Sequence, residues 1–325
     1  MLTAVPAGTL VAIGGAEDKL GRKPVLRHFV ELAGGPDARI VVCATASALG
    51  DEITKLYETV FGRLGVADVV SVRPQTREEA DDPAAAAAVE AATAVFMTGG
   101  NQLKLSSVVT GTGFGDAIGA AYRRGRVIGG TSAGASVLSE HMVAFGASGA
   151  TPKNRISQLA RGLGLLPGVI IDQHFSQRNR YGRLLSLVAQ NPSLLGLGVD
   201  EDTAAVIRGG RFVEVIGRGC VFVCDGRTAV TNAAAATRTA ALLVSGAVVH
   251  ALPAGSRFDL ADVRLVDFGD GDGDVVASAP VAASDSAPGA EKVARRVAAE
   301  GADDAVVQRN ARRRERRRSG EDDDV

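Results

Sequence analysis

The chain has 325 residues, of which 46% are hydrophobic and 4% aromatic, and it contains no tryptophan. A core of this kind is built from alanine, valine, leucine and isoleucine, which suits a parallel sheet covered by helices. The 36 basic and 37 acidic side chains leave a formal net charge of −1. This balance excludes attraction of the whole molecule to nucleic acid or to an anionic membrane by charge alone.

Short β-branched runs alternate with helix-like segments through the first 130 residues. Five runs are typical of buried strands that end in small residues: TLVAIGG (9–15), ARIVVCATAS (38–47), ADVVSV (67–72), TAVFMTGG (93–100) and RVIGG (126–130). Helical periodicity with glycine stops or a proline start separates them, at 23–35, 52–65, 82–92 and 114–125. The alternation predicts an α/β fold, a mostly parallel sheet flanked by helices on both faces and joined by right-handed crossovers.

The texture of the sequence changes twice after this region. From about residue 195, glycine and polar turns separate strand-like runs, which predicts additional antiparallel strands toward the C-terminus. From Gly269 the chain is small and polar, then carries blocks of like charge. We therefore expect one folded domain over residues 1–268 and a disordered, low-complexity charged tail over 269–325. An arginine block at 312–318 could bind an anionic partner, but a solvated tail is the favoured interpretation.

The cysteines and the hydropathy pattern indicate in which cellular compartment the protein is expected. Cys43, Cys220 and Cys224 are odd in number and lack metal-ligand spacing with any histidine. They are expected to be small buried hydrophobic residues rather than a disulfide framework or a zinc site. The N-terminal segment lacks a basic leader, and no apolar run reaches the length of about 18 residues typical of a membrane span. A cytoplasmic location is the expectation.

Ser132 lies in a Gly-x-Ser-x-Gly pattern, GTSAG, between strand-like RVIG and helix-like ASVLSE. Small neighbours allow a strand and a helix to close around a serine with a strained backbone. The hydroxyl would then face solvent at the carboxyl edge of the sheet, where the Ala133 N–H could donate to an oxyanion. The alternative is an ordinary glycine-rich turn capped by serine, and the pattern alone does not separate the two.

A nucleophilic serine requires a base, and the chain has four histidines. His28 lies in a helical stretch, His141 soon follows the serine segment, and His250 ends an apolar run far downstream. His174 directly follows the β run GVIIDQ, so we expect it at the same sheet edge as Ser132. The alternative for His174 is a structural histidine in the core.

The base in turn requires a carboxylate that orients its imidazole. The cluster VDEDTA places Asp200, Glu201 and Asp202 where an apolar run meets a loop. We choose Glu201, with Asp202 in reserve, and the alternative is a solvated acidic turn. Asp172, two residues before the histidine, is better placed to meet a substrate.

With these residues assembled, the sequence resembles the cyanophycinase family of serine peptidases. This family is related to aspartyl dipeptidase, in a fold like that of class I glutamine amidotransferases. The resemblance rests on five segments in family order: AIGGAEDK (12–19), FMTGGNQLKL (96–105), GGTSAGAS (129–136), IDQHFSQRNRYGRL (171–184) and GLGVDEDTA (196–204). The fourth segment favours this family over the dipeptidases, which share the serine turn and the GG loop.

The resemblance implies a triad of Ser132, His174 and Glu201, and a substrate with a poly-aspartate backbone that bears arginine on each side chain. It implies release of β-aspartyl-arginine dipeptides, and a homodimer. The implied pocket residues are Gln102, Asp172, Gln173, Arg178, Arg180 and Arg183. Asn101 stands where the family often has aspartate, which is a departure.

The residues themselves agree with such a substrate. Arginine forks bind carboxylates, and an aspartate such as Asp172 can accept from a guanidinium. In the expected mechanism His174 activates Ser132, and the N–H groups of Ala133 and Gly100 hold the oxyanion. No metal or organic cofactor is needed, and IGGAED lacks the features of a nucleotide-binding loop. An α-aspartyl dipeptidase, and an inactive fold with a binding role, remain as alternatives.

Overall fold

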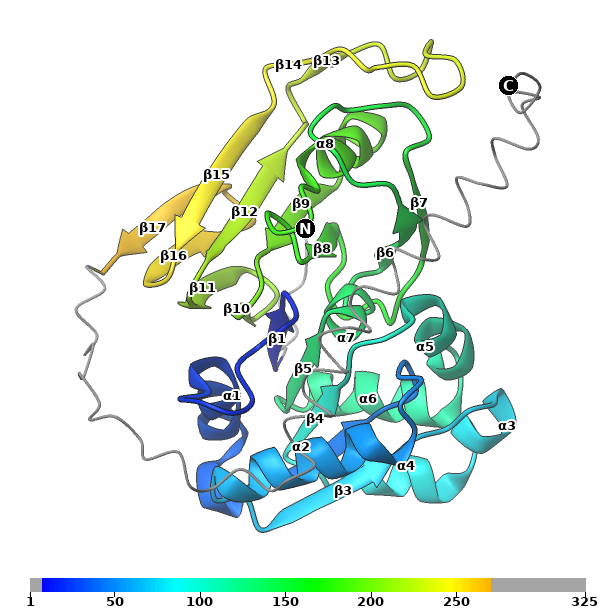
Figure 1. Ribbon diagram of the computed structural model, residues 1–325, viewed down its shortest axis with the longest axis vertical. Coiled ribbons are helices and arrows are strands. Elements are labelled where there is room, and N and C mark those ends of the chain that lie inside the picture. The colour runs from blue at the N-terminus through cyan, green and yellow to red at the C-terminus, as the bar shows by residue number, and fades with distance from the viewer. Residues whose placement is uncertain (1–7, 270–325) are drawn as a thin grey trace, which may run out of the picture.

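Five neighbouring strands of the large sheet are parallel, as the alternating pattern predicts (Figure 1). The computed structural model describes residues 8–269 of the protein, so the predicted tail with its arginine block lies outside the described residues. The parallel strands, in spatial order, are β1 (Thr9–Ile13), β5 (Val127–Thr131), β4 (Ala94–Met97), β2 (Arg39–Cys43) and β3 (Asp68–Val72). Antiparallel strands extend this sheet beyond β1: β10 (Thr203–Arg208), β11 (Phe212–Gly217), β16 (Ser256–Asp259) and β17 (Arg264–Phe268).

Helices cover both faces of this nine-stranded sheet, which confirms the predicted fold class. On one face lie α1 (Pro24–Ala33), which the short 3-10 turn η1 (Gly35–Asp37) follows, and α2 (Asp51–Arg63). Four aromatic residues gather here, with the Phe96 ring in contact with Phe29, Tyr57 and Phe61. The other face carries α3 (Arg77–Ala80), α4 (Pro83–Glu90), α5 (Gln102–Val109), α6 (Gly113–Arg123) and α7 (Ala133–Ser136).

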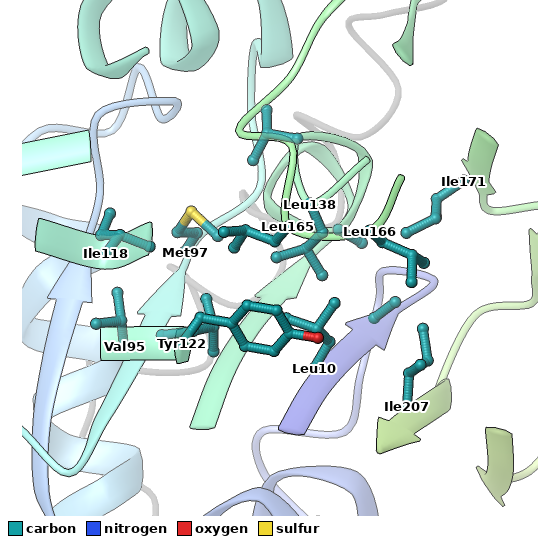
Figure 2. Packing of buried hydrophobic residues seen from close by; sticks show 14 of the residues in the cluster. Leu10, Val95, Met97, Ile118, Tyr122, Leu138, Leu165, Leu166, Ile171 and Ile207 are labelled. Carbon is teal, nitrogen blue, oxygen red and sulfur yellow. The ribbon is translucent and has the colours of Figure 1, made fainter. Parts of the chain in front are cut away.

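A second sheet of four strands packs against this other face. Its strands, in spatial order, are β15 (Val248–Pro253), β12 (Cys220–Asp225), β9 (Leu195–Val199) and β8 (Val169–Gln173). Ile171 of β8 shares one core with Leu10 and Ile207 of the large sheet (Figure 2). Helix α8 (Tyr181–Gln190) covers the opposite face of the second sheet. The remaining strands form two small hairpins: β6 (His141–Gly146) with β7 (Ser157–Arg161), and β13 (Val230–Thr231) with β14 (Val244–Ser245).

Two expectations about local structure need correction. The strand before His174 is β8, which belongs to the second sheet, so His174 and Ser132 do not share one sheet edge. The long-range pairing of β8 with β9 decides this, and a hydrophobic run does not record its partner strand. The helix after Ser132 is a single turn that ends at Ser136.

The expected burial of the cysteines is confirmed for two of the three. Cys43 and Cys224 are buried, as expected, whereas Cys220 is half-buried. Within residues 8–269, no helix combines the length and hydropathy that crossing a membrane requires.

Strand register brings the ends of several strands together. Ile13, the last residue of β1, lies opposite Thr131 at the end of β5 and opposite Ala204 at the start of β10. In the second sheet, Gln173 at the end of β8 lies opposite Val199 at the end of β9. The turn 200–202 then carries the chain from β9 into β10, and so from one sheet to the other. The loops after β1, β5, β8 and β9 therefore meet where the two sheets join.

Candidate active site

Ser132, His174 and Glu201 lie within hydrogen-bonding distance in the order that nucleophilic catalysis requires. The Ser132 Oγ is 3.0 Å from His174 Nε2, and His174 Nδ1 is 2.6 Å from Glu201 Oε1. The serine comes from the large sheet, the histidine from the second sheet, and the glutamate from the turn that links them. This arrangement can deprotonate a hydroxyl while the carboxylate holds the imidazole.

The backbone at Ser132 has the strained conformation typical of a nucleophile at a strand-to-helix turn. Its φ is +51° and its ψ is −109°, and its N–H donates to Ile13 O at 3.0 Å. A Cβ on Gly130 would collide with the backbone of Gly134, and one on Gly134 would collide with Met97. Glycine at both flanking positions is therefore a steric requirement of the turn.

His174 is also fixed by its backbone. Its φ is +47°, and its N–H donates to Gly14 O at 2.7 Å. The imidazole lies against Gly15, where any side chain would collide with the ring. Burial lowers the pKa of His174 below its ordinary value, and the charges of Arg178 and Arg180 lower it further, against the opposing effect of Glu201. The ring is therefore held in its neutral, basic form.

The geometry separates Glu201 from its reserve, Asp202. The hydrogen bond from His174 lowers the pKa of Glu201 below its ordinary value, so this carboxylate is ionised. Its backbone N–H donates to Gln177 Oε1 at 2.9 Å, a contact that the sequence did not predict. The Asp202 carboxylate instead accepts from the Asp18 N–H at 2.9 Å and pairs with Arg218 at 3.2 Å. Glu201 is thus the acid in contact with the imidazole.

The two expected oxyanion donors lie beside the serine turn. Ala133 is the first residue of α7, so its N–H has no acceptor within the helix. Gly100 has a φ of +134°, and a Cβ there would collide with the carbonyl of Ala46. A Cβ on the preceding Gly99 would lie 3.4 Å from the Ser132 Cβ, so this loop passes close to the nucleophile.

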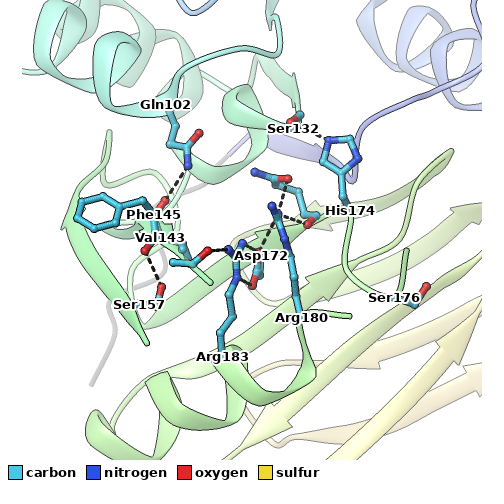
Figure 3. Close-up of polar contacts among 12 residues, drawn as sticks. Gln102, Ser132, Val143, Phe145, Ser157, Asp172, His174, Ser176, Arg180 and Arg183 are labelled. Carbon is cyan, nitrogen blue, oxygen red and sulfur yellow. Dashed lines mark hydrogen bonds and ion pairs between the residues drawn. The ribbon is translucent and has the colours of Figure 1, made fainter. Parts of the chain in front are cut away.

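Three of the six implied pocket residues form a buried cluster of charges behind His174 (Figure 3). Arg183 donates to both oxygens of Asp172, from Nε at 2.6 Å and also from Nη2. Arg180 Nη1 lies 3.4 Å from the same carboxylate and donates to the Gln173 carbonyl at 2.5 Å and to its side-chain oxygen at 2.8 Å. Burial alone would raise the pKa of Asp172, but the two arginines outweigh it and hold the pKa below its ordinary value.

The other implied pocket residues differ in their access to solvent. The buried Gln102 donates from Nε2 to the carbonyls of Val143 and Ala144, at 3.2 and 2.9 Å. Arg178 is half-buried, whereas Arg180 and Arg183 are only 1% and 3% exposed. Arg178 is therefore the arginine of this segment that a substrate can reach most directly.

The segment AIGGAEDK contributes more than the sequence indicated. Besides Gly14 and Gly15, it supplies Glu17, whose buried carboxylate accepts from the Tyr57 and Thr131 hydroxyls at 2.6 and 2.5 Å. The sequence offered one signal, a glutamate next to a glycine turn after a buried strand. Its partners lie far away in the chain, so spacing could not identify them.

Comparisons with known proteins agree with this geometry. The model of peptidase family S51 matches residues 10–215. Cyanophycinases of Geminocystis herdmanii and Trichormus variabilis are 39% and 40% identical over 253 residues. Each match covers 77% of this chain, together with 93% and 85% of the respective relative.

A solved structure gives independent support for the fold. The crystal structure of a peptidase from an acI-B1 Actinobacterium superposes with a TM-score of 0.56 at 21% identity. It covers 76% of this chain and 99% of its own. At this identity the likeness concerns the fold alone, whereas the family model and the cyanophycinases match the sequence itself. The chain belongs to peptidase family S51.

Proposed function

We propose that this protein is a serine exopeptidase that hydrolyses cyanophycin, multi-L-arginyl-poly-L-aspartate, to β-aspartyl-arginine dipeptides. One observation carries the proposal: Ser132 Oγ, the His174 ring and Glu201 Oε1 form a continuous hydrogen-bonded chain of 3.0 and 2.6 Å. The cyanophycinases that match most of the chain support the choice of substrate.

In the proposed mechanism, His174 Nε2 takes the Ser132 proton as the oxygen attacks the scissile backbone carbonyl. The N–H groups of Ala133 and Gly100 stabilise the oxyanion, and the imidazolium then protonates the leaving amine. Glu201 accepts from Nδ1–H throughout and stabilises the positive charge that forms on the ring. Water, activated by the same histidine, releases the acyl group from the serine.

Substrate recognition is proposed to rest on the segment that follows His174. The resemblance assigns Gln102, Asp172, Gln173, Arg178, Arg180 and Arg183 to the pocket. Their contacts support direct binding of a substrate carboxylate best at the half-buried Arg178. Asp172 is already paired with Arg183. This pairing favours a structural role for Asp172 next to His174 over contact with a substrate guanidinium.

The test incubates the wild type and the Ser132→Ala variant with insoluble cyanophycin and, separately, with α-aspartyl dipeptides. Mass spectrometry identifies the products. We expect β-aspartyl-arginine from the wild type alone, because the variant lacks the nucleophile. Cleavage of the small α-peptides only would instead identify an α-aspartyl dipeptidase.

We further propose that residues 1–268 form the catalytic domain and that the rest of the chain is dispensable for hydrolysis. Strands β16 and β17 belong to the large sheet and extend it to Phe268, which supports this division. A chain truncated after residue 269 should release dipeptide at the wild-type rate. Loss of activity on truncation, or binding of a partner without any hydrolysis, would favour a binding role for the fold.

A homodimer in the cytoplasm is the remaining part of the proposal. The family resemblance supports the dimer, and the hydropathy pattern of the chain supports the location. Sedimentation equilibrium of the purified protein measures the first, and fractionation of the source cells measures the second. A monomer across the micromolar range would remove the dimer from the proposal.

A further inference from the structure

A buried polar cluster that the proposed chemistry does not use lies directly behind the nucleophile. It consists of Glu17, Lys19, Tyr57 and Thr131, all buried. Glu17 Oε2 accepts from the Thr131 hydroxyl at 2.5 Å, and Oε1 accepts from the Tyr57 hydroxyl at 2.6 Å. Lys19 Nζ lies 2.9 Å from Oε1 and donates to the Glu17 carbonyl at 3.2 Å. The cluster therefore joins the loop after β1 to helix α2 and to the end of β5.

Glu17 is ionised in this setting. Burial alone would raise its pKa, but Lys19 and the two hydroxyl donors outweigh burial and hold the pKa below its ordinary value. A buried carboxylate with two hydroxyl donors and one ammonium partner is fully satisfied. The cluster therefore holds the loop after β1 in place and leaves the Glu17 carboxylate no need of a ligand.

The segment that Glu17 anchors contacts all three loops of the triad. Ile13 O accepts from Ser132 N–H at 3.0 Å, and Gly14 O accepts from His174 N–H at 2.7 Å. Gly15 O accepts from Asp202 N–H at 2.9 Å, next to Glu201 in the chain. Residues 13–15 therefore contact the serine, the histidine and the turn that carries the acid.

The bond to Thr131 acts on the residue before the nucleophile. Ser132 has a φ of +51°, which for a residue other than glycine costs about 1–3 kcal/mol and persists only when its surroundings enforce it. Thr131 is 3% exposed, and its hydroxyl is the side-chain group that ties the end of β5 to the anchored loop. Loss of this tie lets the turn relax and moves the Ser132 Oγ away from His174.

We propose that Glu17 is a positioning residue for the peptidase reaction: through Thr131 and residues 13–15 it holds Ser132 and His174 in their reactive geometry. Glu17 touches neither the serine oxygen nor the imidazole. This inference rests on the proposed function for its substrate, but it concerns the reactivity of Ser132 and can be measured without cyanophycin.

The experiment compares Thr131→Val with Thr131→Ser, which differ in the hydroxyl that Glu17 binds. We measure kcat and KM on cyanophycin, and the rate at which a small phosphonofluoridate labels Ser132. For Thr131→Val we expect kcat and the labelling rate to fall together by about 10-fold or more, with KM within about twofold, because displacement of a reacting group by even ~1 Å costs up to ~100-fold. Thr131→Ser should restore both rates.

Thr112→Val is the matched control. Thr112 is a buried threonine, 2% exposed, that directly precedes α6, and its hydroxyl donates to the carbonyl of Val109, the last residue of α5. This variant should lower the melting temperature but keep the labelling rate. If the Glu17→Gln variant folds, it should lower kcat and the labelling rate as Thr131→Val does. If it does not fold, the comparison of Thr131→Val with Thr131→Ser tests the proposal alone.

Two results would overturn the inference. One is a Thr131→Val variant with wild-type kcat and labelling rate despite a lower melting temperature, which would make the cluster purely structural. The other is a Thr131→Ser variant as slow as Thr131→Val. A wild type that is labelled at Ser132 but leaves cyanophycin intact would refute the proposed substrate only, while a wild type that is not labelled would refute both proposals.

Discussion

The serine and the histidine of the site are each held by a buried polar cluster, and the two clusters differ in charge. Thr131, at the end of β5, is bound by Glu17, whose charge Lys19 balances. Gln173, at the end of β8, is bound by Arg180, which with Arg183 surrounds the single carboxylate of Asp172. Each cluster thus binds the residue before Ser132 or before His174, but only the cluster on the histidine side has an excess of positive charge.

The difference in charge between the two clusters has different consequences for Ser132 and for His174. A neutral cluster behind Ser132 places no net charge near the nucleophile while it enforces a strained turn. Excess positive charge beside His174 adds to burial in lowering the pKa of the ring, and it would attract the carboxylates of the proposed substrate. The arginines that would attract carboxylates thus make the His174 imidazole a weaker base, and Glu201 partly offsets this loss of basicity.

The largest expected effect concerns the acid that completes the histidine side. Glu201→Gln should lower kcat by about 10³- to 10⁴-fold, because the amide cannot hold the imidazole in the required tautomer or stabilise the imidazolium. Asp202→Asn, one residue away, should lower kcat by less than about tenfold. Steady-state hydrolysis of cyanophycin measures both, and the reverse order would transfer the triad acid to Asp202.

The next effect separates the two clusters by stability. Asp172→Asn takes the paired carboxylate away from the buried Arg183, so we expect a loss of about 3–5 kcal/mol in the free energy of unfolding. Thr131→Val removes one hydrogen bond and should cost about 1–2 kcal/mol. Urea unfolding followed by circular dichroism measures both losses.

A double variant, Asp172→Leu with Arg183→Met, sharpens that test. Removal of both partners leaves no orphaned Arg183 charge, so it should be less destabilising than Asp172→Asn. Equal costs for Asp172→Asn and Thr131→Val would show that the ion pairs stabilise the histidine side no more than one hydroxyl–carboxylate hydrogen bond stabilises the serine side.

The smallest effect is on the pH dependence. Catalysis requires neutral His174, and its pKa lies below the ordinary value of 6.5, so kcat/KM should be lost only below about pH 6.5. Arg178→Gln removes a positive charge, which makes protonation of the ring easier and raises its pKa. The acid limb of the profile should therefore move to higher pH.

The control for this shift is Arg124→Gln. Arg124 is exposed and lies after α6, near the start of β5 and hence at the opposite edge of the sheet from Ser132. Its loss should leave the acid limb in place. An unchanged limb in Arg178→Gln, or an equal shift in both variants, would show that local charge does not tune the histidine.

Local patterns in the sequence were enough for the alternating strands and helices and for the turn around Ser132. They record burial and backbone shape, which depend on a residue and its near neighbours. The same patterns singled out Ser132, His174 and Glu201, and in the structure His174 lies within hydrogen-bonding distance of both of the others. The signal for these three residues was a polar side chain directly after a strand-like apolar run.

Partners across the chain had to await the folded molecule. Only the structure places β8 in a second sheet, pairs Asp172 with Arg183, and joins Glu17 to Thr131 across 114 positions of sequence. A hydrophobic or charged residue indicates what kind of partner it requires, but many residues in the chain could be that partner. Which one it meets depends on strand pairing and packing over the whole molecule.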